Sequence, residues 1–186
     1  MTTVFLSGSR KLSRLNREIR DRLQNIVDKQ FSVIIGDANG ADKALQKYFS
    51  EIHYQNVIVF CSGNSCRTNL GNWNVKHVLV NQNLKGRDFY TQKDKEMAAE
   101  ADYGFVLWDG KSPGSFNNIL ELLKKNKKAL VYYSPDNEFL LVSKLEDVQI
   151  LLAKCDQESL NKISKKINLS SSIREIECLA QGSLSF

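Results

Sequence analysis

The sequence predicts an α/β fold, namely a doubly wound, mostly parallel, five-stranded Rossmann-like sheet with a C-terminal helical extension. Short apolar segments alternate along the chain with segments whose apolar residues recur every three or four positions, the spacing of a helix face. The short segments are apolar almost without interruption, which is typical of parallel strands covered on both faces. The 186 residues, 42% of them hydrophobic and 25% charged, suffice for one domain with a buried core.

Five segments are predicted to be strands. They span residues 3–7, 31–35, 56–61, 103–108 and 129–133. Two further segments, residues 75–80 and 139–142, could add a short extra strand and an edge strand. Strands that alternate with helices form parallel sheets through right-handed crossovers, so we expect a spatial order such as 3-2-1-4-5 for the main strands.

Helices are expected after the strands. They comprise an apolar stripe at residues 12–27, a segment after the loop at residues 36–40, residues 88–101 and residues 116–125. Beyond residue 136, an apolar stripe at residues 145–152 and a charged segment near residues 157–167 predict two more helices. We divide the chain into a Rossmann-like domain, residues 1–136, and an edge strand with a helical C-terminal extension packed on it, residues 137–186.

The composition is mildly basic. A net charge of +5 and a pI near 9.0 favour partners that carry phosphate, although many proteins of other function are equally basic. The arginines at positions 14, 17, 20 and 22 have no aromatic residues among them, as a groove for nucleic acid would need. A nucleic-acid partner is therefore less favoured than a small molecule.

The N-terminal segment MTTVFLSGSR lacks the features of a secretory signal, and no apolar run approaches the ~20 residues that cross a bilayer. We therefore expect a cytoplasmic protein with no membrane partner. Its cysteines, Cys61, Cys66, Cys155 and Cys178, would then be reduced. No second cysteine pair or nearby histidine completes a metal site with Cys61 and Cys66, so neither a metal nor a cofactor is predicted.

Three loops are expected to meet at one edge of the sheet. They span residues 7–10, 36–42 and 109–115, and each follows a predicted strand and precedes a predicted helix. In a doubly wound sheet such loops line the carboxyl edge, and ligands bind where the winding direction reverses. The free N–H groups at the helix starts attract anions.

The residue types in these loops suit a nucleotide. Glycines let a ligand approach the backbone, hydroxyls and cations contact phosphate, and carboxylates accept hydrogen bonds from ribose. The candidate ligand-binding residues are Ser7, Gly8, Ser9, Arg10, Gly36, Asp37, Asn39, Asp42, Asp109, Gly110, Lys111, Ser112, Gly114, Ser115 and Asn118, together with Arg67 and Trp73 in the connection after the third strand. Two alternatives stay open, because such residues also form turns and helix caps and Trp73 could simply anchor its loop.

Sequence motifs, both absent and present, limit the kinds of nucleotide-binding protein that the chain can be. Neither GxGxxG nor GxxxxGK[ST] occurs, which argues against ordinary NAD dehydrogenases and P-loop hydrolases. Three segments occur in order, GSR (8–10), GDANGAD (36–42) and KDKEMAAEADYGFVLWDGKSPGSFNNI (93–119). Together they resemble the SLOG superfamily over about residues 3–134. The resemblance implies a Rossmann-type fold related to cytokinin-activating phosphoribohydrolases, DNA-uptake processing proteins and, more distantly, nucleoside deoxyribosyltransferases.

The resemblance also bears on catalysis. Its enzymatic members carry a glutamate at the glycosidic carbon, where this chain has Asn118, and a neutral amide cannot act as a nucleophile or base there. Asp94 matches an acidic position beside the sugar in the deoxyribosyltransferases, and Asp109 is a second carboxylate on the rim. These two are the candidate catalytic residues, although capping a turn or pairing with a lysine would explain them equally well.

Three functional hypotheses follow. The first is binding of a nucleotide or nucleotide-derived ligand by the domain at residues 1–136, acting as a sensor or binding module. The second is an enzyme that cleaves or transfers the N-glycosidic bond of a nucleoside monophosphate. The third is binding of single-stranded nucleic acid. The sequence leaves a homo-oligomer open.

Overall fold

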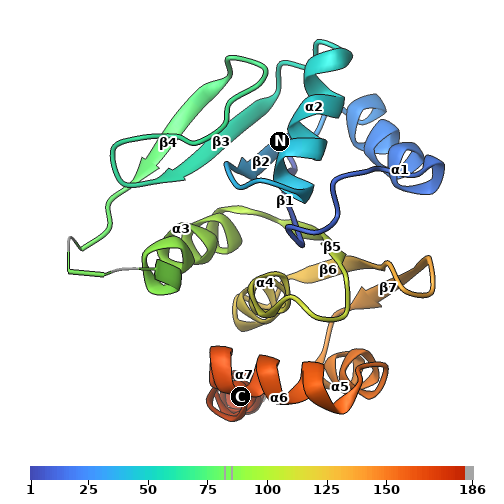
Figure 1. The fold of residues 1–186 in the computed structure, drawn as a ribbon, viewed down its shortest axis with the longest axis vertical. Helices are drawn as coiled ribbons and strands as arrows, with labels where there is room; N and C mark the ends of the chain where they lie inside the picture. Colours follow the sequence, from blue (N-terminus) through green and yellow to red (C-terminus); the bar gives the residue numbers. More distant parts are fainter. Residues whose placement is uncertain (82, 85, 183–186) are drawn as a thin grey trace.

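A computed structural model describes residues 1–81, 83–84 and 86–182. Seven strands form one sheet in the order β4-β3-β2-β1-β5-β6-β7 (Figure 1). The strands are β1 (Thr3–Gly8), β2 (Ser32–Gly36), β3 (Val57–Ser62), β4 (Asn74–Val78), β5 (Tyr103–Trp108), β6 (Lys128–Tyr133) and β7 (Glu138–Val142). The predicted α/β class and the order of the five main strands are confirmed. The two tentative segments add the parallel edge strand β4 and the antiparallel edge strand β7.

Helices cover both faces of the sheet (Figure 1). They are α1 (Arg17–Asp28), α2 (Ala41–Glu51), α3 (Gly86–Glu100), α4 (Pro113–Lys124), α5 (Leu145–Ala153), α6 (Gln157–Ile167) and α7 (Leu169–Gly182). The buried residues of α1 and α2 belong to one core cluster, and those of α3 and α4 belong to the other. The sheet is thus wound on both sides, as the sequence predicts.

Continuous apolarity within the strands follows from this double cover. In β1, Val4 and Leu6 pack beneath α1 and α2, while Phe5 packs beneath α3 and α4. Phe5 and Leu6 are 1% and 0% exposed, so neighbouring residues on opposite faces are both fully buried. Burial of each such side chain stabilises the fold by about 1.5–3 kcal/mol.

Helix starts are fixed by local sequence. The side chain of Asn16 accepts a hydrogen bond from the Ile19 amide at 2.9 Å and caps α1, and its amide nitrogen donates to the Tyr132 hydroxyl of β6 at 2.7 Å. Ser112 caps α4, whose first residue is Pro113, a residue that suits this position because it lacks an N–H group. These caps set where the loops before α1 and α4 end.

The C-terminal helices extend the core on one side of the sheet. Buried side chains of α5, α6 and α7 join the same cluster as those of α3 and α4, and α6 and α7 pack on α4 (Figure 1). Residues 183–186 of the predicted extension lie outside the described residues. Within the described part of the chain, no helix is both long and apolar enough to span a membrane.

The expectation of four reduced cysteines is wrong for two of them. Cys61 and Cys66 form a disulfide, whereas Cys155 and Cys178 carry free thiols. Cys61 lies near the end of β3, and the chain turns at Gly63, which has a φ of 70°. The turn brings the two Cα atoms to 5.2 Å, within the range that a disulfide requires.

Candidate functional site

The three predicted loops meet at the carboxyl ends of β1, β2 and β5. The Ala41 amide at the start of α2 donates to the carbonyl of Ser9 at 3.3 Å, and the Ser9 hydroxyl donates to the Asp109 carboxylate at 2.9 Å. Gly40 has a φ of 88°, and a side chain there would overlap the backbone of Arg10. The loops are therefore packed against one another rather than merely close in the topology.

Loop 109–115 is held largely by its own polar groups. The Asp109 Oδ1 atom accepts hydrogen bonds from the amides of Lys111 and Ser112 at 3.0 and 2.8 Å, in addition to the one from Ser9. The Ser115 hydroxyl lies 3.2 Å from that of Ser112 and 3.2 Å from that of Ser9. Asp109, a candidate catalytic residue, thus stabilises a turn in this structure.

A second group of polar residues surrounds the buried side chain of Lys93, in α3. Its Nζ atom lies 3.2 Å from the Asp94 carboxylate and 3.9 Å from that of Asp37. Asp42, at the start of α2, faces the same ammonium group across Gly36. A methyl group added to Gly36 would lie 2.5 Å from Asp42 Oδ2 and 2.8 Å from Lys93 Nζ. Glycine at this position therefore makes room for the charged groups, which we call the Lys93 cluster (Asp37, Asp42, Lys93 and Asp94).

Burial and charge shift the ionisation of this cluster. Burial raises the pKa of Asp42 to about 6, although the Lys93 charge opposes this effect. Burial also acts to raise the pKa of Asp37, but hydrogen bonds from Arg67 and the charge of Lys93 outweigh it and leave the pKa lowered. For Lys93, burial acts to lower the pKa, and the surrounding carboxylates overcome it, so the pKa is raised. The lysine therefore stays protonated at neutral pH.

Asn118 of α4 links this cluster to β1. With its amide oriented to match donors with acceptors, its nitrogen donates to Asp94 Oδ2 and to the carbonyl of Gly114, each at 3.2 Å. Its oxygen accepts from the Ser7 hydroxyl at 3.2 Å. The structure thus brings Asn118, Ser7 and Asp94 together, as a shared site requires.

Sequence reasoning missed Lys93, although a signal was present. Phe89 and Met97, both apolar, lie four residues before and after it in the predicted helix, a spacing that places all three on one face. Lysine in the middle of an inward-facing helix stripe is unusual, because a buried ammonium group is costly unless it is paired. The position of Lys93, 4% exposed, is the consequence of that spacing.

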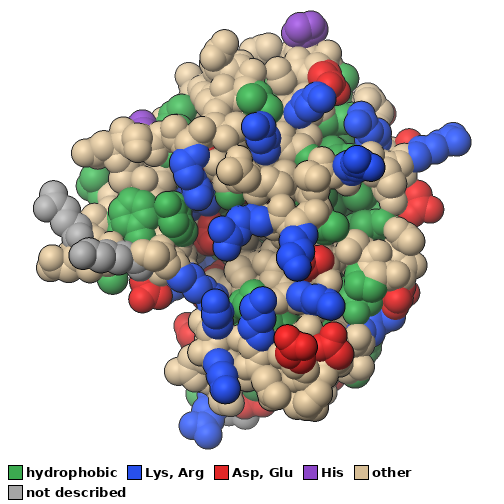
Figure 2. Space-filling view, viewed as in Figure 1, with side chains coloured by type: hydrophobic (Ala, Val, Ile, Leu, Met, Phe, Trp, Pro, Cys, Tyr) green, Lys and Arg blue, Asp and Glu red, His purple; other side chains and the backbone are tan. Residues whose placement is uncertain are grey.

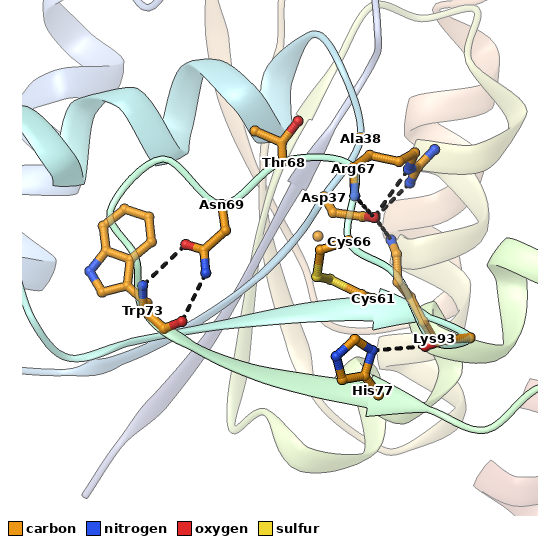
Figure 3. Close-up of a disulfide and its surroundings, with 12 residues drawn as sticks. Asp37, Ala38, Cys61, Cys66, Arg67, Thr68, Asn69, Trp73, His77 and Lys93 are labelled. Carbon is orange, nitrogen blue, oxygen red and sulfur yellow. Dashed lines mark hydrogen bonds and ion pairs between the residues drawn. A yellow bond between two sulfur atoms is a disulfide. The ribbon is translucent and has the colours of Figure 1, made fainter.

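Arg67 and Trp73 have different surroundings (Figure 3). The Arg67 amide and Nε donate to Asp37 Oδ2 at 3.0 and 3.1 Å, and its Nη2 donates to Oδ1 at 2.6 Å. The guanidinium also lies over the Tyr90 ring, 4.3 Å from its centre. Both Asp37 oxygens are thus bonded to Arg67 rather than left for a ribose.

Trp73 is buried away from the rim. It is 6% exposed, and its indole nitrogen donates to the carbonyl of Tyr54 at 2.7 Å. The side chain of Asn69 bonds to both the amide and the carbonyl of Trp73. In this structure Trp73 anchors its loop, and a stacking role for it would require the loop to open.

The outer part of the rim is positively charged. Arg10, Asn39, Lys111 and Gly114 are exposed. Figure 2 shows Lys and Arg side chains gathered over the middle of the face where Figure 1 places the loops before α1 and α4, with acidic side chains between them. Two cavities, of about 470 and 290 Å³, lie elsewhere. The first is lined by α3, α4 and α7, and the second lies at the amino ends of β1 and β5.

The structure thus places most predicted site residues on one rim, with Trp73 in the core.

Comparison of the chain with protein-family models and with curated proteins finds no match.

Proposed function

We propose that the protein binds a nucleotide or nucleotide-derived molecule at this rim, acting as a sensor or binding module. The observation that carries the proposal is the Lys93 cluster beneath an exposed, positively charged surface. Charged side chains are rarely buried, because removing each charge from water costs free energy that its partners must offset. Here the carboxylates of Asp42 and Asp94 lie inside the rim around Lys93, and the exposed cations Arg10 and Lys111 lie outside it, an arrangement that fits a sugar and a phosphate respectively.

The inner carboxylates suit hydroxyl groups. Asp42 lies beside Gly36 at the end of β2, and Asp94 is linked through Asn118 to Ser7 of β1. Their carboxylate oxygens can accept hydrogen bonds from ribose hydroxyls, as acidic residues do in other doubly wound folds. The Asn118 amide holds the Asp94 carboxylate in place. These groups favour a ligand that carries several hydroxyls.

The outer cations and the start of α4 suit phosphate. Arg10 and Lys111 are exposed. Lys111 Nζ lies 3.9 Å from the Asp156 carboxylate, and more than half of each side chain is exposed, so this pair is weak. Gly114 lies in the first turn of α4, and apart from its chain neighbours and the backbone of its own turn, a methyl group there would meet no atom within 4 Å. A phosphate can therefore approach the helix start without displacing protein atoms.

The test is calorimetric titration of the wild-type protein with a panel of nucleotides, with a labelled single-stranded oligonucleotide included. We expect one nucleotide to bind, and Gly114→Val to abolish its binding because the new side chain occupies the open space. Arg10→Ala should weaken binding, whereas Arg174→Ala, which removes an exposed arginine of α7, should not. Absence of binding by every nucleotide, or unchanged binding by Gly114→Val, contradicts the proposal.

One observation favours a second candidate, cleavage of an N-glycosidic bond. Asp42, with a pKa of about 6, holds a proton for part of the time near neutral pH, and Asp94 lies in the same cluster. Glycosidases use such a pair, one carboxyl as acid and the other as nucleophile or base. Chromatography of nucleoside monophosphates incubated with the protein should then show free base, and Asp94→Asn should abolish it. No release of base excludes this candidate and leaves the binding proposal intact.

A further inference from the structure

The Cys61–Cys66 disulfide lies directly before the residue that closes one side of the rim. Cys61 is fully buried, Cys66 is partly exposed, and Arg67 follows Cys66 in the chain. Figure 3 shows Asp37 between Arg67 and Lys93, next to the disulfide. The covalent bond thus fixes the backbone immediately before Arg67 to the end of β3.

Arg67 in turn fastens its loop to the end of β2. Its three hydrogen bonds to Asp37 join the loop after β3 to the loop after β2, and its contact with Tyr90 joins it to α3. Beyond Arg67, the Gln46 side chain holds the backbone of Thr68 and Leu70 at 3.2 and 3.0 Å. The Arg67 guanidinium is therefore the contact nearest to the disulfide that holds this loop to the rim.

We infer that Cys61 and Cys66 form a reversible redox site, reduced by an external dithiol, which controls whether Arg67 is held on Asp37. Without the covalent closure, the six residues from Cys61 to Cys66 regain conformational freedom. Holding the Arg67 backbone amide and guanidinium on one carboxylate then costs more entropy, and the loop opens more often.

The exchange can start at Cys66. A thiolate of the reductant attacks the partly exposed Cys66 sulfur, forms a mixed disulfide, and releases Cys61, which takes up a proton from solvent. The second thiol of the reductant then attacks the reductant's other sulfur, the one bonded to Cys66 in the mixed disulfide. This closes the reductant's disulfide and releases Cys66, which is also protonated. One protein disulfide becomes two thiols, and the dithiol becomes a disulfide, so two electrons and two protons are transferred.

Reduction would also free two thiols beside a third metal-binding group. Oxygen of Asp37 and the two sulfurs lie within 4.8 Å of one another. Because the Lys93 ammonium group lies 3.9 Å from Asp37 and its positive charge opposes a bound cation, we assign this site to thiol chemistry. The test is run with a chelator so that no metal contributes.

Amide hydrogen exchange, followed by NMR in the oxidised and dithiothreitol-reduced protein, tests the inference without using any nucleotide. Mass spectrometry should show a gain of two hydrogens on reduction. Hydrogen exchange at the Arg67 amide should become faster by about tenfold or more. Exchange at Met97, a buried residue of α3, and at the Trp73 indole should stay the same. In the Cys61→Ser/Cys66→Ser variant, exchange at Arg67 should be fast with and without dithiothreitol.

Each other outcome overturns the inference. A disulfide that resists dithiothreitol in the folded protein is structural and not a reversible site. Reduction with unchanged exchange at Arg67 shows that the bond does not control the loop. Acceleration at both Arg67 and Met97 shows that reduction unfolds the protein rather than releasing one loop. Because the readout is the loop itself, these results are independent of the proposed nucleotide site.

Discussion

Two regions of the rim satisfy their polar groups in different ways. In loop 109–115, the Asp109 carboxylate and the neighbouring serines bond to backbone amides and to one another, as turns and helix caps do. Around Lys93, charged side chains are buried together and bond mainly to other side chains. The first arrangement is explained by loop geometry alone. In the second, Asp42 also accepts a hydrogen bond from the Ala38 amide, and Asp37 accepts one from the Arg67 amide. No turn requires the buried Lys93 ammonium group, however, which is why the cluster carries the functional proposal.

The largest effect should come from removing the central cation. Lys93→Met leaves Asp42 and Asp94 without their counter-charge, and breaking a buried pair costs about 3–5 kcal/mol of unfolding free energy. Urea denaturation measures this quantity. The matched control is Lys95→Met, an exposed lysine on the same helix, which should change stability by less than about 0.5 kcal/mol. Equal effects of the two substitutions would show that the buried cluster has no special energetic role.

The next largest effect is a dependence of the unfolding free energy on pH, caused by Asp42. The usual pKa of the Asp42 carboxyl is 3.8, and burial raises it to about 6 in the folded protein. Between these values the folded state retains a proton that the unfolded state has released, so folding is favoured at the lower pH. Raising the pH through 6 ionises the buried carboxyl, and the stability contribution falls by up to about 3 kcal/mol.

The comparison that isolates this group is wild type against Asp42→Asn, unfolded at a series of pH values. Titrating groups that do not interact with Asp42 are present in both proteins and cancel. The stability of wild type relative to the variant should decrease from pH 4 to pH 7. A relative stability that stays constant or increases over this range would mean that Asp42 is ionised throughout.

A smaller loss of stability is expected from Gly36→Ala, because Gly36 makes room for the Lys93 cluster. Gly36→Ala places a methyl group 2.5 Å from the Asp42 carboxylate and 2.8 Å from the Lys93 ammonium, and this overpacking should cost about 1–3 kcal/mol. Gly114→Ala, at an open position in α4, should be neutral or slightly stabilising. Thermal unfolding of both variants provides the comparison, and a tolerated Gly36→Ala would show that the cluster is loosely packed.

The smallest effect belongs to the turn. Asp109→Ala removes the acceptor of three hydrogen bonds in a partly exposed loop and should destabilise the fold by about 1 kcal/mol. Asp109→Asn keeps an acceptor oxygen at the same place and should cost less. Guanidinium denaturation of the two variants distinguishes them, and a loss as large as that in Lys93→Met would remove the contrast between the two regions.

The fold and the meeting of the loops could be predicted because they depend on local patterns. Apolar runs fix the strands, and the alternation of strands and helices fixes which loops share an edge, so the contact of Ser9 with Asp109 follows across 100 residues. The partners within the rim depend on loop conformation, which no periodicity encodes. The pairing of Asp37 with Arg67 and the burial of Trp73 were therefore beyond the sequence.

The disulfide could not be predicted from the sequence pattern either. Its formation depends on the turn at Gly63, whereas the expectation of reduced thiols came from the compartment inferred for the whole chain. Lys93 is the opposite case, since its place on an inward-facing helix stripe could be read directly from spacing.

The central claim is tested most directly by titrating the isotopically labelled protein with the nucleotide that binds and following its glycine amides by NMR. We predict that the signals of Gly8, Gly36, Gly110 and Gly114, all on the rim, shift with ligand concentration, while that of Gly104, at the opposite end of β5, does not. Shifts confined to Gly104 and its neighbours, or no shift at any of these glycines, would contradict the account.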